Sequence, residues 1–201
     1  MGFCEVEDVE QILNLDITDA MDLYSCERAI AAVTEAIKNW CQQSIELIED
    51  DEITLDCSGG DMLFLPELPV RSVKSVIEDG DILSVNDDYK LGQYGILHRI
   101  GQDWAEGVQI IQITYTHGYE SIPADIVDVA ARSAARVYQA GLRAKEYDGI
   151  TGVSSMSLGD FSVSYGSEQG GVGEGVMGVS AARVLLLSEK DILNRYRIVR
   201  L

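Results

Sequence analysis

Apolar residues recur at helical spacing in two stretches near the N-terminus. In residues 6–13 they are Val6, Val9, Ile12 and Leu13, which predicts a short helix. In the second stretch the apolar residues share one helical face, and they are Cys26, Ile30, Val33, Ile37 and Trp40. Residues 16–19 offer capping side chains just before this face, so the pattern predicts a long helix over residues 20–42.

Alternation of apolar and polar positions replaces the helical period after Ser44, and it predicts strands. Residues 45–47 and 53–57 alternate in this way with Asp50 and Asp51 between them, which indicates a hairpin. Further short strands are predicted at residues 62–65, 73–77, 82–85, 89–91, 96–100 and 108–115. The pair Asp79-Gly80 is of the kind that a tight two-residue turn favours. We therefore expect an antiparallel meander or small sandwich after the long helix.

A second long helix is predicted over residues 123–147, because Pro123 is tolerated in a first helical turn and acidic residues follow it. One face is rich in small residues, which lets a partner helix approach closely: Ile126, Ala130, Ala134, Val137, Gly141 and Ala144. The opposite, polar face carries Asp125, Asp128, Arg132, Arg136, Gln139 and Arg143. Its arginines, Arg132, Arg136 and Arg143, are candidate subunit contacts, and Asp128 is spaced to pair with Arg132.

The chain changes character after Tyr147. Residues 149–157 resemble a loop and residues 158–165 a strand, and residues 166–178 form a glycine-rich tether that we expect to be mobile. Near the end, Ile192, Leu193 and Tyr196 share a face, which predicts a short amphipathic helix over residues 189–197.

Together the elements predict an α+β fold: two long packed helices plus short helices, with an inserted antiparallel β subdomain and an extended C-terminal arm. A chain of 201 residues is long enough to bury a core. The expected divisions are residues 1–43 for the N-terminal helices, 44–121 for the β subdomain, 122–148 for the second long helix, and 149–201 for the tether and docking arm.

The formal charge of −19 is unevenly distributed along the chain. Of the 34 acidic residues, 25 precede Pro123, compared with six of the 15 basic residues. Binding of nucleic acid through this acidic body is disfavoured, because phosphate affinity depends on lysine and arginine. No apolar run approaches the roughly 20 residues that cross a bilayer, and the acidic N-terminus is unlike a signal peptide. We therefore expect synthesis in the cytosol and no membrane contact.

Candidate chemistry is sparse. The glycine spacing of residues 173–178 matches a dinucleotide-binding fingerprint only weakly, since no parallel-strand unit precedes it. Neither His98 nor His117 has a second ligand at zinc spacing, and the acidic runs 49–52 and 78–81 do not follow the EF-hand pattern. The four cysteines are scattered and expected to be reduced. We predict no cofactor, no metal site, no catalytic residue and no enzymatic activity.

Several motifs, in order, resemble one known family. They are Leu68-Pro-Val-Arg-Ser-Val-Lys-Ser-Val76, Tyr115-Thr-His-Gly-Tyr119, Ile122-Pro-Ala-Asp-Ile126, Leu158-Gly-Asp-Phe-Ser-Val-Ser-Tyr165 and Asp191-Ile-Leu-Asn-Arg-Tyr-Arg197. Each motif is moderately specific, and together they cover most of the chain. The sequence is similar to the head-to-tail adaptor (connector) proteins of long-tailed bacteriophages.

This resemblance implies a structural virion protein in the neck, made in the host cytoplasm during assembly. It implies a homo-oligomeric ring, commonly of twelve subunits, with the portal protein above and a head-closure or other tail-side neck protein below. DNA would pass through the channel without specific binding. The C-terminal arm would contact the portal or a neighbouring subunit. Its apolar contact residues, which would be unfavourable if exposed on a monomer, would be Leu185, Leu186, Leu187, Ile192, Leu193 and Tyr196. Arg195 and Arg197 lie beside them in the sequence and would be charged contacts.

Three alternatives remain open from the sequence. A head-closure or tail-terminator protein would occupy a layer further from the portal. A small hydrolase would use His98 or His117 as the base for a serine or cysteine nucleophile. A soluble acidic mimic of nucleic acid would also account for the charge, although the mixture of helices and strands does not particularly favour it.

Overall fold

The computed structural model describes residues 2–146, 155–158, 161–164 and 184–198. The chain divides into two compact units, one of Met1–Thr34 with Asp128–Leu186 and one of Glu35–Val127 with Leu187–Leu201. Helices and antiparallel sheets are both present, which confirms the predicted α+β class. The predicted tether at residues 166–178 lies outside the described residues.

The first unit is mainly helical. It contains α1 (Val6–Leu13), the first part of α2 (Ala20–Cys41), most of α3 (Ala124–Glu146) and the hairpin of β8 (Ser155–Leu158) and β9 (Phe161–Ser164). The side chains of Glu5 and Asp8 form a capping box at the start of α1, satisfying N–H groups that have no partner within the helix. The observed bounds confirm the three helices predicted from apolar spacing.

The small-residue face of α3 is buried along its first half. Ala130 and Ala134 are fully buried, as is Val33 of α2. The prediction is wrong at Gly141, which is exposed and lines a groove of about 280 Å3 with Ala29 of α2 and other residues of both helices. The close approach of the helices therefore depends on the N-terminal half of the predicted face.

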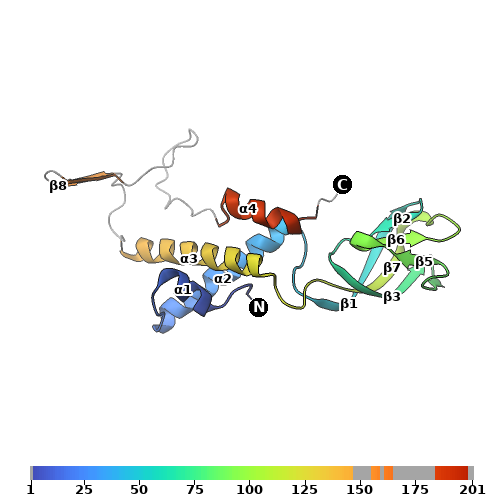
Figure 1. The fold of residues 1–201 in the computed structure, drawn as a ribbon, viewed down its shortest axis with the longest axis horizontal. Coiled ribbons are helices and arrows are strands. Elements are labelled where there is room, and N and C mark those ends of the chain that lie inside the picture. The colour runs from blue at the N-terminus through green and yellow to red at the C-terminus, as the bar shows by residue number, and fades with distance from the viewer. Residues whose placement is uncertain (1, 147–154, 159–160, 165–183, 199–201) are drawn as a thin grey trace. The chain divides into compact units, whose positions relative to one another are not determined.

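The second unit contains the β subdomain, shown as one group of strands in Figure 1. Its larger sheet has the order β1 (Ile48–Ser58), β7 (Glu106–His117), β3 (Val70–Glu78) and β4 (Asp81–Leu83). The smaller sheet has the order β2 (Met62–Phe64), β6 (Ile96–Arg99) and β5 (Tyr89–Leu91), with the short helix η1 (Gln93–Gly95) before β6. All strand pairs within the two sheets are antiparallel.

Both sheets contribute to one apolar core, so of the two predicted arrangements the structure has the sandwich. The buried residues of this core are Cys57, Leu63, Leu65, Val76, Tyr89, Leu97, Trp104, Ile111, Ile113 and Tyr115. Leu97 and Ile111, one from each sheet, are fully buried. Alternate residues of the central strands point into this core, which explains the period-two pattern.

The predicted hairpin at residues 45–57 is wrong. Residues 48–58 form the single strand β1, which pairs with β7 along most of its length. Asp50 has a φ of 52°, and the register shifts between Ile48 and Asp51, so the acidic pair forms a bulge within a strand and not a turn. The predicted turn at Asp79-Gly80 is confirmed, since both residues have positive φ between β3 and β4.

Candidate docking surface

The candidate docking surface is built on residues 184–198, which contain α4 (Leu187–Leu193) and the short helix η2 (Asn194–Tyr196). In the second unit, α4 lies beside the C-terminal end of α2 (Figure 1). Leu193 is fully buried, and the Ile198 N–H donates to the Cys41 carbonyl over 2.9 Å. The Gln43 side-chain amide donates to the carbonyl of Tyr196. The segment from Leu187 to Ile198 is thus packed and hydrogen-bonded within its own unit.

Tyr196 contacts the start of α3 and anchors this segment there. Its hydroxyl lies 2.8 and 2.9 Å from the two carboxylate oxygens of Asp125, and its ring meets Tyr119 edge to face at 6.0 Å. Burial and the hydrogen bond to Asp125 raise the pKa of Tyr196 to about 12. The neutral, donating form of the phenol is therefore the form that the folded state favours.

Replacing Tyr196 by phenylalanine is expected to lower the free energy of unfolding by about 1 to 2 kcal/mol, since a hydrogen bond to a charged group is lost. In the native chain, a pKa raised above the ordinary value of about 10 gives stability that is present below pH 10 and lost as the pH rises toward 12. Urea unfolding between pH 8 and 11.5 measures this, and Tyr196→Phe should show a smaller loss at high pH. Equal losses in both proteins would contradict the role of Tyr196.

Two cationic side chains of the C-terminal segment contact the ring of Trp40. Lys190 Nζ lies 4.4 Å and the Arg197 guanidinium carbon 4.8 Å from the centroid of the Trp40 ring. Such cation–π contacts contribute most where water is partly excluded, and Trp40 is half-buried. These contacts orient the basic side chains of the segment.

The predicted arm residues divide into a buried and an exposed set. Leu185 and Leu193 are 7% and 0% exposed, so the prediction that they offer apolar surface to a partner is corrected: both are covered by the chain itself. Tyr196 is partly buried and used as an anchor. The exposed residues are Leu186, Leu187, Ile192, Arg195 and Arg197, with Leu187 at 72%. The last four of these, all in the second unit, form the candidate docking surface.

The predicted arginine stripe of α3 is not one continuous surface. Arg132 pairs with Asp128 at 2.9 Å, which confirms the predicted i, i+4 pair. Arg136 is half-buried and donates to the Ser133 hydroxyl and the Val184 carbonyl, so it holds the chain next to α3. Arg143 is exposed. A partner could reach Arg132 and Arg143 more readily than Arg136.

Neither histidine has a nucleophile as a hydrogen-bond partner in the described part of the chain. His117 is buried, stacks on Tyr115, and has Nε2 3.2 Å from a carboxylate oxygen of Asp51. His98 is half-buried on β6. All four cysteines are buried and free, and burial raises the pKa of Cys4 to about 12. Among the described residues there is also no group of three metal-binding side chains, and no helix that is long and apolar enough to span a membrane.

A family model described as head completion protein matches residues 3–134. The chain belongs to the head completion protein family. As a member of this family it is a structural protein of the phage neck, which confirms the predicted class of function and its location in the virion. No curated protein matches this head completion protein.

Solved structures similar to this head completion protein come from gene transfer agent (GTA) particles. The neck of the native particle computed with C12 symmetry gives a TM-score of 0.44 at 17% identity, covering 98% of this chain and 89% of the other. The neck of the empty particle computed with C6 symmetry gives 0.49 at 19% identity, covering 98% and 90%. The native virion gives 0.46 at 17% identity, with the same coverage as the first. These three TM-scores are below 0.5, and the family assignment rests on the match over residues 3–134.

The anchors of the C-terminal segment were missed in the sequence. Trp40 was assigned only to the apolar face of a helix, and Gln43 and Asp125 were assigned to no contact. Their partners lie far along the chain: 71 positions separate Asp125 from Tyr196, and 153 separate Gln43 from it. A polar residue placed directly after a predicted helix end, as Gln43 is, was the only local signal.

Proposed function

We propose that this head completion protein is a ring-forming head-to-tail adaptor without enzymatic activity. In this proposal twelve copies form a ring under the portal, a tail-side neck protein binds below, and DNA passes through the channel. The observation that carries the proposal is the family match over residues 3–134. The candidate hydrolase has less support, because His117 is buried against Tyr115, all four cysteines are buried, and burial raises the pKa values of Cys4, Cys26 and Cys41.

The parts of the chain have separate roles in this proposal. Residues 1–43 and 122–148 supply the helical scaffold, residues 44–121 the β subdomain, and residues 149–201 the docking arm. The acidic body supports passage of DNA, since carboxylates along a channel repel phosphates and prevent adhesion. A ring with a predominantly basic lumen would contradict this part. Direct contact with the portal distinguishes an adaptor from a head-closure or tail-terminator protein.

The candidate docking surface supports a contact with the portal. Leu187 and Ile192 are apolar and exposed on α4, while Arg195 and Arg197 follow them in the chain. An apolar patch beside arginines is typical of the buried centre of a protein–protein interface. Because the segment is already folded in its unit, docking through these side chains does not require a disordered arm to fold first.

Replacing both Leu187 and Ile192 by aspartate is expected to abolish co-sedimentation of the protein with portal-bearing heads. Both side chains are exposed, so the variant should keep the melting temperature of the native protein within a few degrees. Phe64→Asp is a matched control, because Phe64 is 65% exposed and lies on β2. Undiminished binding by the double variant, or equal loss in the control, would contradict the role of this surface.

A further inference from the structure

A notch of mixed polar and apolar lining lies within the second unit, beside the turn that contains η1. It has a volume of about 410 Å3. The residues lining it come from the ends of several elements and include Leu68, Val70, Tyr94, Gly95, Arg195 and Arg197. We call it the arginine notch, after Arg195 and Arg197. It shares Arg195 and Arg197 with the candidate docking surface, but its lining does not include the exposed Leu187 and Ile192 of α4.

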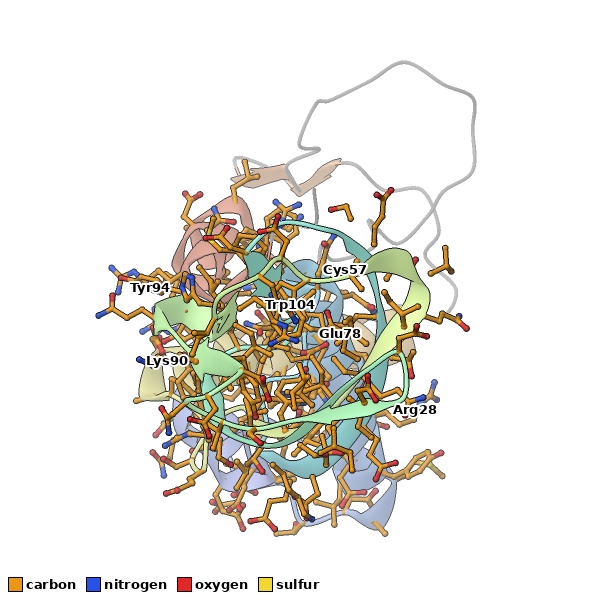
Figure 2. All side chains as sticks on the ribbon, turned by 90° about the vertical axis from the view of Figure 1, so that its right-hand side faces the viewer. Arg28, Cys57, Glu78, Lys90, Tyr94 and Trp104 are labelled. Carbon is orange, nitrogen blue, oxygen red and sulfur yellow. The ribbon has the colours of Figure 1, made fainter. Side chains whose placement is uncertain are left out.

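Tyr94 is held at the notch by a strained turn. It has φ 59° and ψ 30°, a left-handed conformation that a bulky side chain rarely adopts, and its side chain is 82% exposed. The next residue, Gly95, also has positive φ, and a Cβ there would lie 2.6 Å from a methyl carbon of Leu68. Figure 2 shows Tyr94 at the edge of the β subdomain, away from the buried Trp104. Strain that presents an aromatic ring to solvent is typical of a binding position.

The two arginines of the notch have no carboxylate partner in the described part of the chain. Arg195 and Arg197 are exposed, and neither forms an ion pair among the described residues. Arg197 also lies over the Trp40 ring, a contact that leaves its charge without an acidic partner. The chain as a whole has 34 acidic and 15 basic residues. Arginine recognises carboxylates with paired N–H donors, and an adjacent tyrosine ring adds apolar contact. The notch therefore fits an acidic turn that also carries an apolar side chain.

The chain has such a turn between β3 and β4, formed by Asp79, Gly80, Asp81 and Ile82. Both carboxylates are exposed without an ion pair among the described residues, and Ile82 is 77% exposed. We call this segment the acidic turn. Its backbone N–H at Asp79 donates to the Ile110 carbonyl, which fixes the turn to the larger sheet. The turn is thus a rigid projection with two charges and one apolar side chain.

The acidic turn and the arginine notch lie at opposite ends of the same strand. Val70, which lines the notch, pairs with His117, while Glu78, next to the turn, pairs with Ile111. β3 has nine residues, so the strand alone separates the two sites by roughly 25 to 30 Å. A chain cannot insert this turn into its own notch. A neighbouring copy can.

We propose that, within the ring, the acidic turn of one copy binds in the arginine notch of the next copy. This inference rests on the proposed ring function. A ring requires a head-to-tail interface between two different surfaces of the same chain, and these two surfaces are different, complementary in charge, and at opposite ends of one subdomain. The contact also offsets the repulsion between subunits that each carry a formal charge of −19.

Phosphates of DNA are the other partners that two arginines could bind. A neighbouring copy of this chain is favoured over DNA as the partner of the notch. The net negative charge of the chain repels DNA phosphates, whereas a neighbouring subunit in a ring always brings its own carboxylates close to the notch. A neighbour's Ile82 also gives Tyr94 an apolar partner, which a phosphate does not. The experiments below distinguish binding of DNA from binding of a neighbouring copy.

Reciprocal charge reversal in the full chain tests the contact. Arg195→Glu with Arg197→Glu reverses the notch, and Asp79→Lys with Asp81→Lys reverses the turn. Each double variant alone should sediment as a monomer at concentrations where the native protein forms rings. An equimolar mixture should restore rings of alternating subunits, because each turn then meets a notch of opposite charge. The control Arg28→Glu with Lys74→Glu changes the net charge as the notch variant does, and should leave ring formation intact.

Cysteine cross-linking gives a second readout that does not reverse any charge. Tyr94→Cys and Ile82→Cys in one chain should yield a ladder of cross-linked oligomers on oxidation, while either single variant should give at most dimers. We expect little unspecific cross-linking through the native cysteines, because Cys4, Cys26, Cys41 and Cys57 are all buried.

The possible results separate this contact from the ring itself. Rings formed by each charge-reversed variant alone, or a mixture that stays monomeric, would overturn the contact while leaving the ring in place. Binding of short duplex DNA that is lost in the notch variant, with rings unaffected, would assign the notch to phosphate and overturn the contact. A native protein that forms no ring even with its portal would overturn the proposed function, and this contact with it.

Discussion

Replacing Gly118 by alanine should destabilise the second unit by about 3 to 5 kcal/mol, the sum of left-handed backbone strain and forced movement of a neighbouring backbone. Gly118 has a φ of 89°, and a Cβ built on it would lie 2.1 Å from the carbonyl oxygen of Glu46. The Gly118 N–H donates to the Pro69 carbonyl, and the next N–H donates to Ile45. The clash cannot be relieved by turning a side chain, because the atom that it meets is backbone.

Gly101→Ala is the matched control for Gly118→Ala. Gly101 has a φ of 75°, and nothing lies within 4 Å of the position where a Cβ would be built. Strain alone should cost about 1 to 2 kcal/mol there. Thermal and urea unfolding of both variants measure the difference. Equal destabilisation by the two substitutions would show that the close approach at Gly118 is not needed.

Replacing Glu78 by alanine should lower the free energy of unfolding by about 3 to 5 kcal/mol, since it leaves the buried guanidinium of Arg99 with only the more distant and more exposed carboxylate of Asp88, at 3.7 Å. The Glu78 carboxylate lies 2.8 Å from Arg99, and the two side chains are 10% and 4% exposed. The other carboxylate oxygen accepts the Ala105 N–H at 2.8 Å. Arg99 also lies over the Trp104 ring, 5.4 Å from its centroid. The pair thus ties β3 and β6 to the loop before β7.

Two comparisons distinguish the loss of a buried charge partner from a general effect of losing an ion pair. Lys74→Ala removes an exposed pair with Asp50, with side chains 62% and 56% exposed, and should cost no more than about 1 kcal/mol. Replacing both Glu78 and Arg99 by methionine should recover much of the stability lost in Glu78→Ala, since no charge is then buried alone. If Glu78→Ala unfolded with the same free energy as Lys74→Ala, the buried pair would have no special role.

Local patterns predicted the helices well because the information for them is local. Cys26, Ile30 and Val33 recur at helical spacing, and they are buried on α2 as expected. The strands were found but their order was not, because β1 and β3 both pair with β7, which lies far along the chain. The acidic pair at Asp50 and Asp51 resembled a turn, and only pairing with β7 makes it a bulge.

The exposure of the arm residues could be predicted only in part, for the same reason. Leu187 and Ile192 were assigned to a docking surface and are exposed, but Leu193 was assigned to it as well and is fully buried. The helical period places Leu193 on an apolar face, and it cannot say whether that face is covered by the chain itself or by another protein. Here the covering elements are distant in sequence, with the Cys41 thiol 3.9 Å from the Leu193 carbonyl.

Electron cryomicroscopy of the purified full-length protein bound to its portal tests the ring most directly. We expect a ring coaxial with the portal, with twelve copies and with the α4 residues Leu187 and Ile192 at the portal face. A single copy bound off the axis, or a ring that contacts only the tail-side protein and not the portal, would contradict the adaptor function.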